Sequence, residues 1–197
     1  KKRDTALLYQ PHVLRRKDGD LAVIFRDRNL SDMIGFIYHR WDPKAAADDL
    51  LRHLENTAMA FTGKDILVTI AMDGENAWEY YTNDGHDFLE YLYKRLSEVN
   101  FLKCVTVSEY LRDHAPVHEI KHLAAGSWIY SEFGKWIGNS QKIRAWEYLS
   151  RARHQLQSIM ESDRRHELSD KMDLIWKQMY ICEGSDWYWW YGDGEMN

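Results

Sequence analysis

An acidic motif directly after an apolar segment is the first place where this sequence has the residues for chemistry. Asp73, Gly74 and Glu75 follow residues 66–72, whose apolar side chains predict a strand buried on both faces. Parallel sheets place active sites at the carboxyl ends of their strands. Desolvation by apolar neighbours and Trp78 would favour a protonated carboxyl, as a general acid requires. The motif indicates catalysis by Asp73, with capping of the next helix as an equally open alternative.

A second candidate is the aromatic segment near the carboxyl end, where Trp187 begins five consecutive aromatic residues. Neighbouring rings in such a run cannot all face one core, so some must be exposed or line a cleft. Flat rings beside carboxylates such as Asp186 suit pyranose sugars, which present apolar C–H faces rimmed by hydroxyls. We predict a sugar-binding surface here. The alternative is that Trp187 and Trp190 pack at the base of a helical hairpin.

The sequence from His118 to His122 matches H-E-x-x-H, the signature of zinc proteases. That chemistry needs both histidines on one face of a helix and a third ligand. Pro116 before the motif, Lys121 inside it and Gly126 soon after it leave little room for such a helix. We therefore expect no metal and a polar loop here, with a zinc hydrolase as the minor alternative.

Two residues that end the first predicted strand, Arg26 and Asp27, are candidates for supporting Asp73. Both carry charges near the carboxyl end of a strand, where they would lie beside the acidic motif if the strands are neighbours. Glu75 is a third candidate, because it lies in the motif itself. A purely structural ion pair is the alternative for Arg26 and Asp27.

The elements that must position these residues form a first part at 1–115. Three apolar segments, at 21–25, 66–72 and 104–107, are predicted to be strands. Three segments between them have helical spacing, at 30–38, 45–61 and 88–96. This alternation predicts a parallel α/β sheet with right-handed crossovers. Three strands do not close a barrel, so the sheet is expected to be part of a larger one.

The second part, 116–197, has the apolar spacing of two packed helices. The first is predicted to begin near Asn139 or Ser140 and to pack through Trp146, and the second to pack through Ile175. We predict a helical hairpin docked on the α/β part.

Composition excludes several classes of protein. With 197 residues and 45% hydrophobic side chains, the chain is an ordinary globular protein, and its net charge of −5 argues against a nucleic-acid partner. There is no membrane-length apolar run and no signal peptide, so we expect a cytoplasmic protein that does not bind membranes. Only Cys104 and Cys182 are present, in apolar sequence surroundings, which excludes a disulfide framework. A first residue other than Met suggests a piece of a longer protein.

Taken together, the motifs resemble glycoside hydrolase family 57, most closely its amylopullulanase and α-amylase-like branch. The similarity spans nearly the whole chain and rests on several motifs in the same order: FRDRNLSDMIGF at 25–36, DGENAWEYY at 73–81, AGSWI at 125–129, WIG at 136–138, RAW at 144–146 and EGSDWYWWYGD at 183–193. The resemblance implies an incomplete (β/α)7 barrel followed by a helical bundle, and cleavage of α-glucosidic bonds with retention. This chain would supply the last barrel strands and the start of the bundle.

The resemblance also implies roles for single residues. Asp73 matches the family's acid/base, whereas the family's nucleophile, a Glu, belongs to an earlier strand that is missing upstream. The missing amino-terminal part of the same catalytic domain is thus an expected partner, together with an α-glucan such as starch, glycogen or maltooligosaccharide. No cofactor is expected. The candidates for contacting sugar are Trp78, Trp128, Asp186, Trp187 and Trp190.

Two other readings share these residues. If a sugar hydroxyl replaces water as the acceptor, the same site becomes a 4-α-glucanotransferase or a branching enzyme. A non-catalytic carbohydrate-binding fragment would keep the aromatic residues and would not depend on Asp73.

Overall fold

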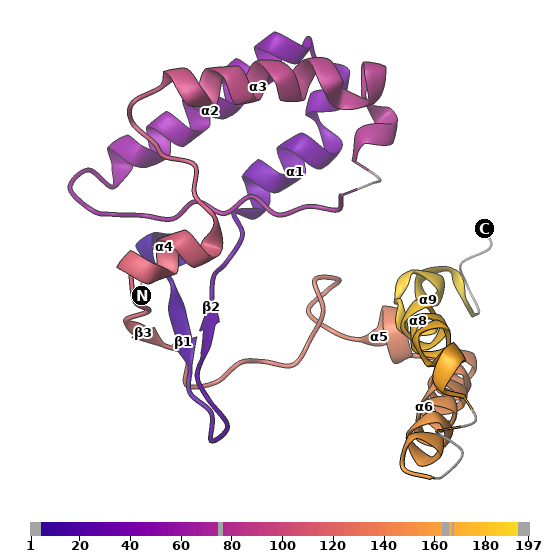
Figure 1. Ribbon diagram of the computed structural model, residues 1–197. Helices are drawn as coiled ribbons and strands as arrows, with labels where there is room; N and C mark the ends of the chain where they lie inside the picture. Colours follow the sequence, from indigo (N-terminus) through magenta and orange to yellow (C-terminus); the bar gives the residue numbers. More distant parts are fainter. Residues whose placement is uncertain (1–4, 75–76, 163–165, 167, 193–197) are drawn as a thin grey trace. The chain divides into compact units, whose positions relative to one another are not determined.

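The computed structural model describes residues 5–74, 77–162, 166 and 168–192 and divides the chain into two compact units. Unit 1 is Lys1–His122 and unit 2 is Leu123–Asn197. Each unit has its own elements (Figure 1) and is described by itself. In the described residues, no helix is both long and apolar enough to cross a membrane.

The sheet of unit 1 is small and mixed. Its strands are β1 (His12–Leu14), β2 (Leu21–Val23) and β3 (His118–Glu119), in the order β2-β1-β3. β1 pairs antiparallel with β2 and parallel with β3, so the expected all-parallel arrangement is not what the described residues show. β2 confirms the first three of the five residues predicted as a strand at 21–25.

Two predicted strands are wrong as secondary structure: among the described residues, neither 66–72 nor 104–107 forms a strand. Segment 66–72 is hydrogen-bonded to neighbouring backbone only at separate points, where Leu67 N donates to Tyr9 O at 2.8 Å and Asp27 N donates to Thr69 O at 2.7 Å. A strand needs consecutive pairs with one neighbour. The apolar pattern predicts a segment buried on both faces, whereas residues 66–70 and Met72 are half-buried and Ala71 is exposed. The missing ladder explains why no strand results.

Helices of unit 1 begin at residues that cap them. Asp27 accepts from Leu30 N at the start of α1 (Arg28–Phe36), and Asp42 accepts from Ala45 N before α2 (Pro43–Ala60). Thr106 and Glu109 form a capping box at α4 (Val107–Asp113). The remaining helices of this unit are η1 (Thr5–Tyr9), η2 (Tyr38–Arg40), η3 (Trp78–Tyr80), η4 (Thr82–Gly85) and α3 (His86–Glu98).

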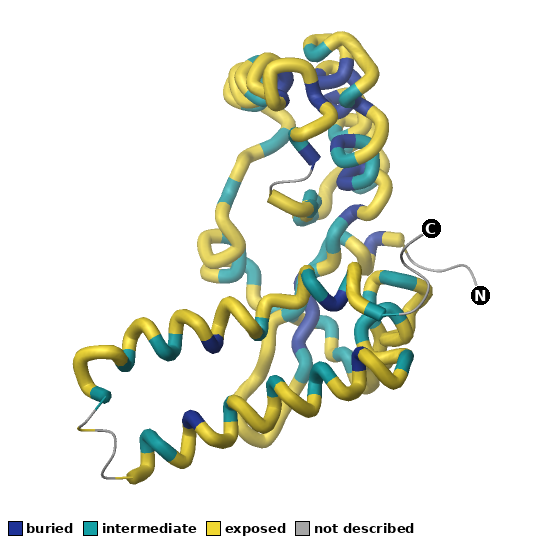
Figure 2. The backbone as a smooth tube through the Cα atoms, turned by 90° about the vertical axis from the view of Figure 1, so that its right-hand side faces the viewer, coloured by how far each residue is buried: buried dark blue, intermediate teal, exposed yellow. Residues whose placement is uncertain are grey.

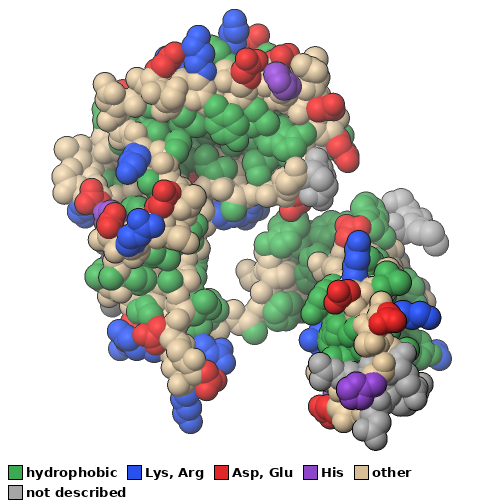
Figure 3. Space-filling view, in the orientation of Figure 1, with side chains coloured by type: hydrophobic (Ala, Val, Ile, Leu, Met, Phe, Trp, Pro, Cys, Tyr) green, Lys and Arg blue, Asp and Glu red, His purple; other side chains and the backbone are tan. Residues whose placement is uncertain are grey.

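The core of unit 1 lies among α1, α2 and α3, where α2 and α3 run side by side (Figure 1). Tyr38, Leu50 and Phe88 are fully buried there. Val68, Ile70 and Met72 pack against this core from the extended segment. Figure 2 shows the buried residues concentrated in these helices. Hydrophobic side chains also reach the surface of both units (Figure 3).

Unit 2 is helical: α5 (Gly134–Ile137), α6 (Ser140–Met160), η5 (Ser169–Lys171), α8 (Met172–Glu183) and α9 (Asp186–Trp190). The predicted start of the long helix is confirmed, because Asn139 caps α6. Leu156 of α6 and Met179 of α8 are buried, whereas both helices are exposed along most of their length (Figure 2). Trp146 and Ile175 are half-buried.

Both cysteines depart from the expectation of apolar surroundings. Cys104 and Cys182 are exposed free thiols.

Candidate functional site

Asp73 follows the extended segment 66–72 and is exposed, so the described residues do not give its carboxyl the apolar surroundings that the sequence predicts. Side chains alternate along an extended chain, so Asp73 falls on the same side as Thr69 and Ala71 and opposite Ile70 and Met72, which pack on the core. The carboxyl therefore belongs to the face of the segment that the core helices leave open. The next described helix, η3, has Ala77 as its N-cap.

Arg26 and Ser31 hold the segment two residues before Asp73. Arg26 Nη1 donates to Ala71 O at 3.0 Å, and Ser31 Oγ accepts from Ala71 N at 3.2 Å. Arg26 also lies 3.5 Å from a carboxylate oxygen of Asp32. The predicted proximity of Arg26 to the acidic motif thus takes the form of a hydrogen bond to the backbone of Ala71, which fixes the chain two residues before Asp73.

Asp27 holds segment 66–72 at its middle residue, Thr69. It is buried, and its backbone N–H donates to Thr69 O while its side chain caps α1 at Leu30 N and accepts from Tyr9 Oη at 2.7 Å. Desolvation first, and then the hydrogen bond and charge of Asp27, raise the pKa of Tyr9 to about 12. Asp27 is therefore a structural anchor for the segment that carries Asp73.

Trp78 lies against the core. Its ring is 5.3 Å from that of Tyr81 and 6.4 Å from that of Phe88, centroid to centroid. It also covers Gly85, which has a positive φ of 76°, so closely that a Cβ there would lie 2.6 Å from Trp78 Cε3. The indole is half-buried by these contacts, and only its remaining surface is open to a ligand. Glu75, the third supporting candidate, lies outside the described residues.

In unit 2, one aromatic cluster surrounds Trp189. Trp128 lies parallel to Trp189, with 5.9 Å between ring centroids and 5° between planes, and Lys135 Nζ is 4.2 Å from the Trp189 centroid. Trp128 and Trp190 are 69% and 65% exposed, respectively. Of the predicted sugar-contacting rings, these two offer the most open surface.

A second aromatic cluster is built around the buried Tyr188. Trp146 stacks on Tyr188 at 4.2 Å and Trp187 contacts it at 3.6 Å between ring centroids. Trp187 Nε1 donates to Cys182 O, and Trp146 Nε1 donates to Trp136 O. Trp187 thus packs at the junction of α8 and α9, as its structural alternative predicts for this residue. Asp186 is exposed at the first position of α9.

The H-E-x-x-H segment is not helical. His118 and Glu119 form β3, and His118 Nε2 contacts Gln10 Oε1, two residues before β1. The zinc motif relies on a helix to place residues four apart on one face, and residues 118–122 do not form a helix, so the segment lacks the geometry that the motif requires. Within the described ranges, there is no group of three or more metal-ligating side chains.

Sequence reasoning missed Tyr9 and Ser31 as supports of the site. Ser31 lies inside the 25–36 motif, so its position was a usable signal. For Tyr9 there was none, because its contact with Asp27 bridges residues 18 apart through tertiary structure.

The fold and the sequence point to the same class of protein. One similar solved structure is a GH57 branching enzyme from the hyperthermophilic archaeon Thermococcus kodakaraensis in complex with glucose, with a TM-score of 0.68 and 18% identity. The match covers 93% of this chain and 41% of that one, so this chain spans about two fifths of that enzyme's length. At this identity the match shows a shared fold.

The sequence model described as glycosyl hydrolase family 57 matches residues 4–122. The chain therefore belongs to glycosyl hydrolase family 57. No curated protein matches the sequence significantly.

Proposed function

We propose that this chain forms part of a retaining enzyme that acts on α-glucans, with Asp73 as the general acid and base. The observation that carries the proposal is the position of Asp73: it is exposed, at the end of a segment fixed by Arg26, Ser31 and Asp27, on the face that the core helices leave open. A general acid must reach the glycosidic oxygen, and this placement gives it access.

In the proposed mechanism, a second carboxylate attacks the anomeric carbon while Asp73 protonates the departing glycosidic oxygen. The resulting glycosyl-enzyme is then opened by water, whose proton Asp73 removes. Retention requires the two carboxyl groups to be about 5–5.5 Å apart. We propose that the nucleophile lies outside this chain, in the part of the catalytic domain that precedes it.

Exposed aromatic rings of unit 2 are proposed to hold the glucan. Trp128 and Trp190 present the largest open ring surfaces, and exposed Asp186 is positioned to accept hydrogen bonds from sugar hydroxyls. Trp78 and Trp187 would contribute through the parts of their rings that packing leaves free. When a sugar hydroxyl takes the place of the attacking water, the same steps produce transfer instead of hydrolysis.

The test is Asp73→Asn in the complete enzyme. Activity on maltooligosaccharides should fall by about 10²–10⁴-fold, because the amide cannot protonate the leaving oxygen. The loss at the glycosylation step should be smaller for an activated substrate with a good leaving group, since its departure needs little protonation.

Asp113→Asn, an exposed acid at the end of α4, is the matched control and should keep full activity. Circular dichroism should show an intact fold for both variants. If Asp73→Asn retains its activity on natural glucan, the assignment of Asp73 is wrong and Glu75 becomes the next candidate. Chromatography of the products separates hydrolysis from transfer.

A further inference from the structure

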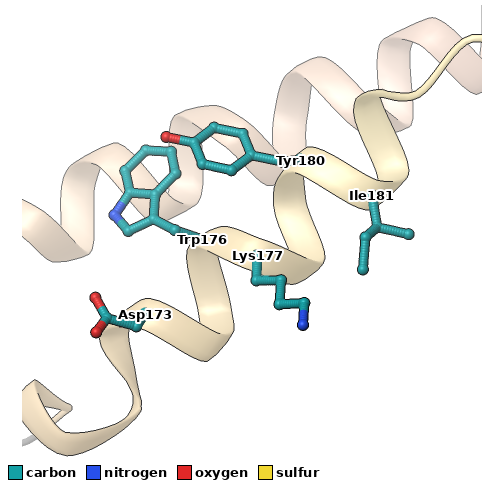
Figure 4. A pocket seen from close by; sticks show the side chains of 5 residues that line it. All are labelled: Asp173, Trp176, Lys177, Tyr180 and Ile181. Carbon is teal, nitrogen blue, oxygen red and sulfur yellow. The ribbon is translucent and has the colours of Figure 1, made fainter.

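One side of α8 carries a shallow depression that none of the motifs includes. Five residues line it, Asp173, Trp176, Lys177, Tyr180 and Ile181, and its volume is about 590 Å³ (Figure 4). They occupy two adjacent stripes of the helix, at intervals of four residues. The volume falls within the range of small-molecule sites, which is about 300–1,000 Å³.

The depression contains a pair of nearly parallel aromatic rings. Trp176 and Tyr180 extend from successive turns of α8 toward the same side (Figure 4), with 5.6 Å between their centroids and 28° between their planes. The Arg153 guanidinium of α6 lies 5.8 Å from the Trp176 centroid and pairs with Glu183. Arg153 thus holds one side of the indole, while Tyr180 remains 60% exposed. The ring pair is fixed in place and open to solvent.

Hydrogen-bonding groups flank the rings. Asp173 lies one turn before Lys177, so a carboxylate acceptor and an ammonium donor border the aromatic pair. Among the residues that the structure describes, neither has a hydrogen-bond or ion-pair partner. Both groups are available to a ligand that carries hydroxyls.

We infer that this face of α8 is a second binding platform for an α-glucan chain, separate from the residues proposed for the catalytic site; the inference rests on the proposed function. A pyranose ring matches the pair in chemistry, since its apolar face covers an aromatic ring while its hydroxyls reach Asp173 and Lys177. A protein partner fits less well, because Lys and Asp are depleted at the centres of protein interfaces. For a polymeric substrate, a second platform raises the effective concentration of further chain segments at the same enzyme molecule.

The test is a titration of the ¹⁵N-labelled 197-residue chain with maltoheptaose, followed through its tryptophan indole N–H signals. Trp176→Phe identifies the Trp176 signal by its disappearance. That signal should shift saturably with sugar, whereas the Trp146 signal, whose N–H donates to Trp136 O, should stay in place. Sorbitol, a polyol without a pyranose face, should leave the Trp176 signal unmoved.

Variants provide the second readout. Trp176→Ala and Tyr180→Ala should each weaken maltoheptaose binding at this platform by at least about tenfold. Leu174→Ala, an equally exposed apolar residue on the same helix, is the matched control and should bind as the parent does.

The outcomes separate this inference from the proposed function. If Trp128 and Trp190 respond to sugar and Trp176 does not, the platform is wrong and the proposed function survives. If no signal moves, or if the Trp176 signal broadens with protein concentration because a second copy covers the face, the platform is also wrong. If Trp176 responds while Asp73→Asn keeps full activity, the platform stands and the acid/base assignment fails.

Discussion

At the scale of single residues, Asp27 connects three segments of unit 1 through its hydrogen bonds. One buried side chain caps α1 and accepts a hydrogen bond from Tyr9, while its backbone N–H holds Thr69 of the segment that leads to Asp73. A buried carboxylate that loses a partner is costly, because water cannot replace it. Asp27 and Tyr9 therefore couple the amino-terminal segment to the position of the proposed acid.

Tyr9→Phe tests this coupling. The free energy of unfolding at neutral pH should fall by about 1–3 kcal/mol, because the variant leaves Asp27 without one hydrogen bond. The pH response should change too. Folding raises the pKa of Tyr9 from its ordinary value of 10.0 to about 12, so its stabilising contribution is complete below pH 10 and is lost as the pH rises to about 12. The variant should lose less stability across that interval.

Denaturant unfolding at neutral pH and at about pH 11 measures both effects. Tyr38 and Tyr81 also have raised pKa values, chiefly because they are desolvated, and they contribute equally to the parent and the variant. The matched control is Tyr130→Phe, an exposed tyrosine, which should behave as the parent does. An identical alkaline loss in the parent and in Tyr9→Phe would show that Asp27 and Tyr9 are not coupled in solution.

At the scale of elements, the sequence predicts helices better than strands. Asp42 with Pro43 and Asn139 mark the starts of α2 and α6, because capping depends on residues within one turn. Segment 66–72 has a strand's apolar pattern, yet its pairing depends on Tyr9 and Asp27, which lie far away in the sequence. Local pattern cannot supply such partners.

The same limit applies to the candidate site. The position of Asp73 after an apolar segment was visible in the sequence, because the apolar run and the Gly that follows Asp73 are local features. The sequence did not show whether Trp78 packs on the core or lies open, because its contacts are with Gly85 and Phe88, in the following turn and helix. Arg26 and Ser31 lie in a motif that the sequence shows, but their hydrogen bonds to Ala71 join residues 45 and 40 positions apart, which a local pattern does not reveal.

Helix α9 provides a test of packing. Tyr188 is fully buried between Trp146 and Trp187, and its hydroxyl has no hydrogen-bond partner in the part of the chain that the structure describes. Burial also raises the pKa of Tyr188. Tyr188→Phe removes an unsatisfied hydroxyl and keeps the stacked ring, so the variant should unfold at equal or higher denaturant concentration.

Tyr188→Ala, which deletes the ring, should instead cost about 3–5 kcal/mol, by analogy with truncation of other buried aromatic residues. Tryptophan fluorescence during urea unfolding measures both variants. A loss above about 1 kcal/mol in Tyr188→Phe would mean that the hydroxyl is hydrogen-bonded in solution.

At the scale of the whole molecule, the proposed function has the 197-residue chain supply one of the two catalytic carboxylates, the general acid and base. One carboxylate cannot serve as both acid and nucleophile in a retaining mechanism. The purified chain should therefore bind maltooligosaccharides without cleaving them. Reducing-end assays at high protein concentration check this, with the complete enzyme as the positive control. Measurable turnover that Asp73→Asn abolishes would place a nucleophile within this chain.

The contact between Trp78 and Gly85 limits which residues position 85 can accept without disturbing the fold. At position 85 any side chain meets the indole, and the left-handed backbone is strained for every residue with a Cβ, so a saturation library should retain almost only glycine there. Gly35, near the end of α1, has open space around it and an ordinary φ, and Gly35→Ala should add up to about 1 kcal/mol of stability. Two glycines in one unit would thus show opposite mutational tolerance, which deep sequencing after selection for folded protein would record.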